Sequence, residues 1–301
     1  MNIFSKKLGL TKKEVLGYSQ SIIYIVTLSI STIWVEHLGN NFSTVFLLFF
    51  STLTATVFFN LFRLKKIIRN HLTITKSPLL WVKMNFYLLG TWSLTYYTTI
   101  HSSATSCLSV IFLVLATCAA IQKKQKLKTS LAVILVIAIY FLSSKMTVFT
   151  MFTGVLAGIS AYFYSIISLH YAVKHNMKAL DVLSIRFYFI LLLTIIIILI
   201  YRHEHILLIY QHGLITIIVT LILLGIINMI LPNILSQNAV YNINPQRFAF
   251  IVSFVPVTVY FLRGMFLRQW SISMLIACLL ASIILNFEKI NLIIRTNDTK
   301  R

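Results

Sequence analysis

Acidic residues are scarce in this chain. Only 6 of its 301 residues are Asp or Glu, and charged residues of both signs make up 11%, whereas soluble domains carry roughly 25%. Because 58% of the residues are hydrophobic, a soluble fold of this length would leave too much apolar surface in water. The shortage of charge therefore excludes a soluble globular protein and favours one that lies in a lipid bilayer.

Further absences exclude whole kinds of chemistry. The sequence has no pair of carboxylates spaced for hydrolysis and no glycine-rich loop for nucleotide phosphates. A proton or sodium relay usually places a carboxylate in the middle of a span. None of the acids lies there; they are Glu14, Glu36, Asp181, Glu204, Glu288 and Asp298. We therefore expect no ATP-driven or strongly ion-coupled pump, and no enzyme.

Cysteine usage gives no sign of a metal site or a disulfide. Cys107, Cys118 and Cys278 all fall inside apolar runs and share no CxxC spacing, so we interpret them as small buried hydrophobic residues. Histidines and two acids gather in segments expected on the outer face: His37, His101, His203, His205 and His212, with Glu36 and Glu204. No ligand spacing is recognisable there, so solvated loops are the expectation, and we expect neither a metal nor another cofactor.

Long apolar runs dominate what is present. A helix needs about 20 apolar residues to cross the hydrocarbon core, and the runs lack the strict alternation of a β-barrel. Ten runs of suitable length are delimited, at residues 17–36, 43–62, 79–99, 103–121, 129–145, 150–171, 182–201, 214–240, 246–263 and 270–287. The sequence thus predicts an all-α integral membrane protein of about ten transmembrane helices, with no connector long enough for a soluble catalytic domain.

The basic residues orient these spans. The net charge of +20 would suggest nucleic acid in a soluble protein, but here the bases cluster between apolar runs, as in loops at a membrane face. If the amino terminus is cytoplasmic and the spans alternate, only four of the 26 Lys and Arg residues face outward: Lys145, Arg202, Arg263 and Arg268. This asymmetry predicts cytoplasmic amino and carboxyl termini, with the first span retained, and no nucleic-acid partner.

The ten runs divide into two similar sets of five. The stretch YYTTIHSSATSCLSVIFLVLATCAA at residues 96–120 aligns with NAVYNINPQRFAFIVSFVPVTVYFL at residues 238–262, which places Ser103 opposite Pro245. Each stretch has a polar span end, a short turn and a long apolar helix, and a basic break follows. Five spans per set would invert one half relative to the other. We expect a first five-helix repeat at residues 1–145 and a second at residues 146–301.

In these two stretches, and in Pro256–Val257, the chain resembles the drug/metabolite transporter superfamily in its ten-span EamA-like form. The chain departs from that pattern at Val114, where members often have proline, and in the basic segments that replace a Gly-Glu pair after the fourth and ninth spans. The resemblance implies a secondary transporter that moves small polar metabolites, such as amino acids or related compounds, by alternating access. Export across a bacterial inner membrane is the expected direction and location.

Other functions remain open at this stage. Uptake or exchange of a nucleotide-like metabolite such as S-adenosylmethionine is an alternative within the same superfamily. An integral membrane enzyme acting on lipids, or a scaffold protein without transport activity, would be a different class. The expected partners are a small-molecule substrate and membrane lipids, and a second copy of the chain, forming a homodimer, is a further candidate.

Polar side chains inside the apolar runs are the candidates for substrate binding, because polar groups in lipid are costly unless they are paired or face a cavity. Pro232 can kink the eighth run beside two amides and free a backbone carbonyl for a ligand. The candidate substrate-binding residues are Tyr24, Asn85, Trp92, Tyr96, Tyr162, Ser165, Asn228, Asn233 and Gln237. Contacts between helices are the alternative role for each of them.

Two further sets of residues have expected roles. Gly154, Gly158 and Ala161 form a small face on the sixth run, which favours close helix packing. Lys83 and Arg186 lie about one turn inside the cytoplasmic boundary, so we expect their side chains to reach the interface. For these two cations, binding an anionic group of the substrate is the alternative.

Overall fold

The structure is a computed structural model of the chain, and it describes residues 11–200 and 214–287. Within these ranges the protein is all-helical. Every apolar run of the sequence falls on a helix or on a helix interrupted once. The successive elements are α2 (Lys12–Leu38), α3 (Thr44–Phe62), η1 (Leu64–Lys66), α4 (Ile67–Lys76), α5 (Pro78–His101), α6 (Ala104–Gln122), α7 (Lys126–Leu142), α8 (Val148–Lys174), α9 (Ala179–Leu183), α10 (Tyr188–Ile200), α12 (Leu214–Gly225), η2 (Ile226–Ile230), α13 (Leu231–Ile243), α14 (Pro245–Val252), α15 (Val255–Leu267) and α16 (Ile272–Leu285).

Seven helical segments in the described ranges are long and apolar enough to cross a membrane. They include the interrupted rods α9–α10, α12–α13 and α14–α15. The other three expected spans are helical too. Of these, α16 is apolar but has 14 residues, and α7 has 17 residues, fewer than the roughly 20 that span a typical bilayer. The chain thus has the helices of a multi-pass membrane protein, and the count of ten spans stays a prediction.

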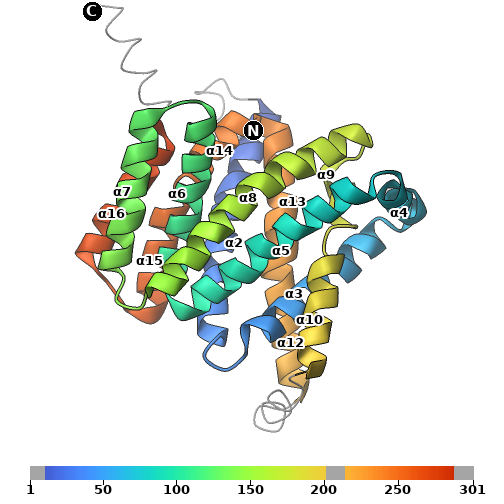
Figure 1. Cartoon of the computed structure of the whole chain (residues 1–301), viewed down its shortest axis with the longest axis horizontal. Helices are drawn as coiled ribbons and strands as arrows, with labels where there is room; N and C mark the ends of the chain where they lie inside the picture. Colours follow the sequence, from blue (N-terminus) through green and yellow to red (C-terminus); the bar gives the residue numbers. More distant parts are fainter. Residues whose placement is uncertain (1–10, 201–213, 288–301) are drawn as a thin grey trace, which may run out of the picture.

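The helices form two groups joined by a crossing pair (Figure 1). One group contains α6, α7, α15 and α16 and encloses a core of small and branched apolar side chains. The other group brings α3 against α10 and α12 around a core rich in phenylalanine and leucine. Helices α5 and α8 pack along each other across the face in view, and α2 packs on α13 and α15. Residues 1–145 and 146–301 therefore contribute helices to both groups.

Three expected spans are interrupted, which the apolar runs do not reveal. Residues 184–187 separate α9 from α10, Ser253 and Phe254 separate α14 from α15, and η2 is a π-helical turn between α12 and α13. Pro232 lies just after that turn, and a proline leaves the carbonyl four residues earlier without its helical donor. In membrane helices, local 3₁₀ or π adjustments of the backbone satisfy the freed carbonyl. The irregularity expected at Pro232 therefore takes the form of a π turn.

The connector at residues 63–78, expected to be a loop, contains a helix instead. Helix α4 buries Asn70 and Thr73 while Ile68 and Leu72 are exposed. Lys65 and Lys66 directly precede it, and Arg69 and Lys76 lie within it. An amphipathic helix with exposed apolar residues and a basic rim is typical of a segment that lies in a membrane interface.

The small face expected on the sixth run is confirmed as a packing surface. Gly154 and Gly158 are buried on α8. A Cβ atom on Gly158 would come within 2.7 Å of the Val114 Cβ and 3.0 Å of the Ile111 carbonyl oxygen, both on α6. On Gly154 the nearest atoms, methyl groups of Thr98 and Val110, would lie 3.3 Å away. The close approach of α8 to α6 therefore depends on Gly158 more than on Gly154.

We expect the same substitution at these two glycines to have different effects. Gly158→Ala should lower the free energy of unfolding by about 1–3 kcal/mol relative to Gly154→Ala, because overpacking against a branched side chain and a backbone atom cannot be relieved cheaply. Both variants gain the same helix propensity, so the comparison isolates the steric effect. Thermal unfolding midpoints in detergent measure it, and equal midpoints for the two variants would contradict the packing assignment.

Candidate functional site

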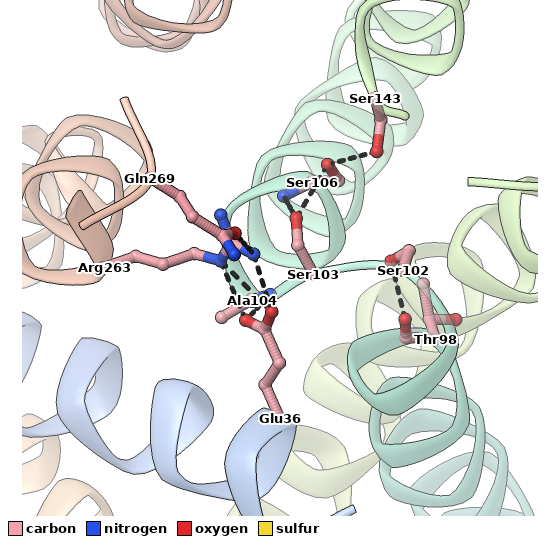
Figure 2. Close-up of polar contacts among 9 residues, drawn as sticks. All are labelled: Glu36, Thr98, Ser102, Ser103, Ala104, Ser106, Ser143, Arg263 and Gln269. Carbon is pink, nitrogen blue, oxygen red and sulfur yellow. Dashed lines mark hydrogen bonds and ion pairs between the residues drawn. The ribbon is translucent and has the colours of Figure 1, made fainter. Parts of the chain in front are cut away.

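One end of the bundle is held by a buried ion pair, and we call it the Glu36 end after its central residue. Glu36, near the end of α2, is 8% exposed. The Arg263 guanidinium of α15 donates to both of its oxygens, with Nη2 to Oε1 at 2.7 Å and Nε to Oε2 at 2.9 Å. The Ala104 amide, at the start of α6, donates to Oε2 at 2.8 Å. One carboxylate therefore connects three helices, as Figure 2 shows.

Hydroxyl groups extend this network along the start of α6. The Ser103 hydroxyl caps the helix by accepting from the Ser106 amide at 3.1 Å, and the Ser106 hydroxyl donates to that of Ser143 at 2.9 Å (Figure 2). The Arg263 Nη2 also donates to the Gln269 side chain at 2.8 Å. A carboxylate at a helix amino terminus is favourable, because the free amides and the helix dipole present positive charge there.

A cavity of about 440 Å³ opens beside this network. Serine hydroxyls from the segments around Ser102, Ser143 and Ser271 line it, together with Lys145 and Arg268. Both of these cations are exposed, while Arg263 is neutralised by Glu36. The cavity is therefore a polar, cationic vestibule at the Glu36 end, beside the ion pair and not inside the bundle.

Each acid in the described ranges is already matched by an arginine. Besides Glu36, these acids are Glu14 and Asp181. Glu14 forms an ion pair with Arg247 at the surface. The buried Asp181 lies 3.1 Å from the Arg63 Nε, with the Lys66 ammonium 3.9 Å away. No carboxylate of the described residues is left for any further buried cation.

A further cation is nevertheless buried. Arg186 is 5% exposed, so the expectation that its side chain reaches the interface is wrong. Its Nη1 donates to the Tyr164 hydroxyl at 2.5 Å and its Nη2 to the Asn233 side-chain oxygen at 2.6 Å. Its Nε is buried and has no partner among the described residues. The guanidinium therefore has neutral partners only. Lys83, by contrast, is exposed, in accord with its expected place.

The chain holds Arg186 in this position through its backbone. Arg186 lies in the non-helical link at residues 184–187, and side chains from other helices bind that link. The Asn60 amide donates to the Ser184 carbonyl at 3.1 Å, and the Trp81 indole N–H donates to the Ile185 carbonyl at 2.9 Å. Non-helical backbone at membrane depth occurs only where protein or a polar cavity surrounds it. The link is thus a fixed support for the arginine.

A second set of interior polar groups lies at the π-helical turn. Asn228, near the middle of the α12–α13 rod, is 3% exposed. The Tyr96 hydroxyl of α5 faces Asn228 and Ser51 of α3. Neither the Tyr96 nor the Ser51 hydroxyl has a hydrogen-bond partner of ordinary geometry. Buried hydroxyls without partners cost about 1–3 kcal/mol each, and π turns are frequent at functional sites.

These two sets belong to one region. Asn233 follows Asn228 by five residues, which is about 7 Å along a helix axis. Trp92 and Tyr164 both pack on the apolar cluster that contains Tyr96 and Phe187. We refer to the six polar residues of these two sets together as the interior polar cluster: Ser51, Tyr96, Tyr164, Arg186, Asn228 and Asn233.

The expected substrate-binding residues divide between this cluster and other places. Tyr96, Asn228 and Asn233 belong to the interior polar cluster, and Trp92 lies beside it, with its ring 6.3 Å from that of Tyr96. Asn85 is fully buried on the same helix; its amide nitrogen donates to the Trp81 carbonyl at 3.0 Å and its oxygen has no partner. The third and eighth runs thus supply three of the six residues of the interior polar cluster.

The remaining expected residues lie elsewhere. Tyr24 packs its ring on Phe248, 5.3 Å away. Tyr162 donates to the Gln122 side chain at 2.5 Å, and Ser165 is exposed and donates to its own helix. Gln237 is half-buried and forms no hydrogen bond with a described residue. The structure does not bring these four residues to the cluster, and their role in substrate binding stays a prediction.

Sequence reasoning missed three important groups. Glu36 and Arg263 are 227 residues apart, and Glu36 was expected in a solvated outer segment. Tyr164 and Ser51 carried no signal beyond being polar residues in an apolar run.

Among the expected outer histidines, His37 and His101 are exposed and no group of three metal-binding side chains occurs in the described ranges; His203, Glu204, His205 and His212 lie outside those ranges.

No protein-family model, no curated protein and no solved structure matches this chain.

The Glu36–Arg263 pair should be a major source of stability. We expect Glu36→Gln to lower the free energy of unfolding by about 3 kcal/mol, because it leaves a buried arginine without its counter-charge. The double variant Glu36→Gln with Arg263→Gln should regain part of this loss, since no charge is then uncompensated. Thermal unfolding of the detergent-solubilised protein measures both.

Glu14→Gln is the matched control, because Glu14 and Arg247 form a surface pair that solvent screens. It should shift the midpoint little. If Glu36→Gln and Glu14→Gln had the same small effect, the buried pair would not be holding the three helices together.

Proposed function

We propose that the protein is a secondary transporter of small polar metabolites, built from two inverted five-helix repeats of the drug/metabolite transporter type. The observation that carries the proposal is the interior polar cluster, in which a buried arginine and unpartnered hydroxyls lie inside an otherwise apolar bundle. A scaffold protein would have no use for such groups, which cost stability unless a ligand completes them. Export of amino acids or related compounds across a bacterial inner membrane is the proposed activity.

The pattern of helix contacts supports two related halves. Let α2, α3, α5, α6 and α7 be the first five spans, and α8, α9–α10, α12–α13, α14–α15 and α16 the second five. Exchanging the halves relates each helix contact to an equivalent one. The α2–α13 contact corresponds to α8–α5, and the α3–α12 contact corresponds to α10–α5. Likewise, α6–α8 corresponds to α15–α2, and α6–α7 corresponds to α15–α16. Both members of every pair are in contact, as are the self-related pairs α3–α10, α6–α15 and α7–α16.

The same correspondence relates the tight turns of the two halves. Helix α5 ends at His101 and α6 begins at Ala104, while α13 ends at Ile243 and α14 begins at Pro245. A capping residue, Ser103 in one turn and Asn244 in the other, accepts a hydrogen bond from the new helix. In the sequence alignment Ser103 stands opposite Pro245, so the two capping residues are one position out of register. An odd number of spans in each half makes the repeats inverted, and inverted repeats place a substrate site near the bilayer midplane.

We expect Tyr96→Phe to impair transport without harming the fold. The Tyr96 hydroxyl faces Ser51 and Asn228 without a hydrogen bond of ordinary geometry to a described residue, so its removal should change the unfolding midpoint little. A substrate bound at the cluster would lose one hydrogen bond, worth about tenfold in flux at low substrate concentration. Proteoliposomes holding the purified protein, screened with labelled amino acids and related metabolites for counterflow, measure the flux.

Ser19→Ala is the control for this experiment, since its exposed hydroxyl bonds only its own helix. It should transport at the wild-type rate. Equal flux from Tyr96→Phe and wild type would contradict the location of the site, and an absence of counterflow for every metabolite would contradict the transporter itself.

We also expect transport to depend little on a pH gradient. The described acids all serve in ion pairs, and none lies among the residues of the interior polar cluster. A facilitator or exchanger needs no proton relay, so collapsing the pH gradient across the vesicles should change the flux by less than about twofold. A steep dependence of flux on the gradient would favour proton coupling instead.

A further inference from the structure

The charge of the buried Arg186 indicates which class of ligand the interior polar cluster binds. We propose that the substrate of this protein bears a carboxylate and that Arg186 binds it in a bidentate manner. This inference rests on the proposed function for its biological meaning, but binding can be tested without transport. It concerns the class of molecule that the interior polar cluster accepts.

Arg186 has no counter-charge among the described residues. Arg186 is 5% exposed, and the acids of the described residues are paired with Arg63, Arg247 and Arg263. Removing the partner of a buried ion leaves a large desolvation cost. The neutral groups around Arg186 accept hydrogen bonds but carry no compensating charge. An anionic ligand would supply the charge that the described residues around Arg186 lack.

The guanidinium of Arg186 also has the geometry to bind a carboxylate. A guanidinium has five N–H donors in a planar fork, and two of them are directed to Tyr164 and Asn233. The Nε–H is buried and has no acceptor among residues 11–200 and 214–287, and each Nη retains a second hydrogen. The pair Nε and Nη therefore presents the parallel donors that match the two oxygens of a carboxylate. The partners on Nη1 and Nη2 keep the fork in one orientation.

Charge balance favours a carboxylate over a phosphate, although the two groups present similar oxygens. A phosphate monoester carries about two negative charges near neutral pH. Arg186 is the one cation of the interior polar cluster, so a single carboxylate balances the charge. The rings of Phe187 and Tyr164 lie 4.6 and 5.6 Å from the guanidinium carbon, which makes the surroundings apolar and penalises a second, unbalanced charge.

The experiment measures thermal unfolding midpoints of the full chain in detergent. The probes are the common amino acids and short dicarboxylates, each compared with its own carboxamide, and inorganic phosphate. At millimolar concentrations, at least one carboxylate should raise the wild-type midpoint while its carboxamide does not. Arg186→Gln should weaken that carboxylate by about 30-fold or more, and Arg186→Lys, which keeps the charge but not the fork, should weaken it less.

Two further readouts separate a binding role from a structural one. Arg247→Gln is the matched control, because it removes an arginine from a surface ion pair and should bind the carboxylate as wild type does. Without ligand, Arg186→Gln should be at least as stable as wild type, since it removes an uncompensated buried charge.

Several results would overturn the assignment. These are equal protection by a carboxylate and its carboxamide, equal protection of Arg186→Gln and wild type, protection by phosphate alone, and protection by no carboxylate of the panel. A ligand-free Arg186→Gln as destabilised as Glu36→Gln would identify Arg186 as a structural residue. Carboxylate binding without flux in vesicles would support the carboxylate site and contradict the transporter. Flux of uncharged substrates alone would support the transporter and contradict the carboxylate site.

Discussion

The cost of burying a charge in an apolar surrounding governs this structure. Only three acids occur in the described ranges, and each is bound by an arginine from a segment remote in the sequence. An unmatched ion within a bilayer costs several kcal/mol, so arrangements that separate these pairs are strongly disfavoured. The two buried pairs thus fix which helices adjoin: Glu36–Arg263 joins α2 to α15, and Asp181–Arg63 joins α9 to the end of α3.

This constraint makes the two ends of α6 unequal. At its start, the Ala104 amide binds the carboxylate that Arg263 also holds. At its other end, Gln122 accepts one hydrogen bond from Tyr162 of α8. These links are related by the proposed exchange of halves, since α2 and α15 correspond to α8 and α6. A bidentate pair in a dry site is much harder to separate than a single neutral hydrogen bond. The Glu36–Arg263 contact is therefore harder to separate than the Tyr162–Gln122 contact.

Local patterns in the sequence predicted local structure well, and remote contacts escaped them. The apolar runs became helices because a backbone in lipid must satisfy its own hydrogen bonds, and the glycine face of α8 became a packing surface because spacing alone defines it. The break at residues 184–187, the helix at 67–76 and the Glu36–Arg263 pair depend on partners far along the chain. For the same reason, Tyr96, Asn228 and Asn233 were identifiable one by one, while their meeting with Ser51 and Tyr164 was not.

Arg186 shows where such reasoning fails and why the failure is informative. A basic residue near the end of an apolar run normally extends to the interface, because water solvates the charge at little cost. Here the link at residues 184–187 is bound by Asn60 and Trp81, so the side chain enters the bundle and gives up that solvation. Two neutral hydrogen bonds do not replace it. A sequence under selection for stability alone would place a neutral residue at this position, whereas a binding site needs its charge in place before the ligand arrives. The buried cation is thus explained by a ligand that supplies the opposite charge, and not by the packing of the helices around it.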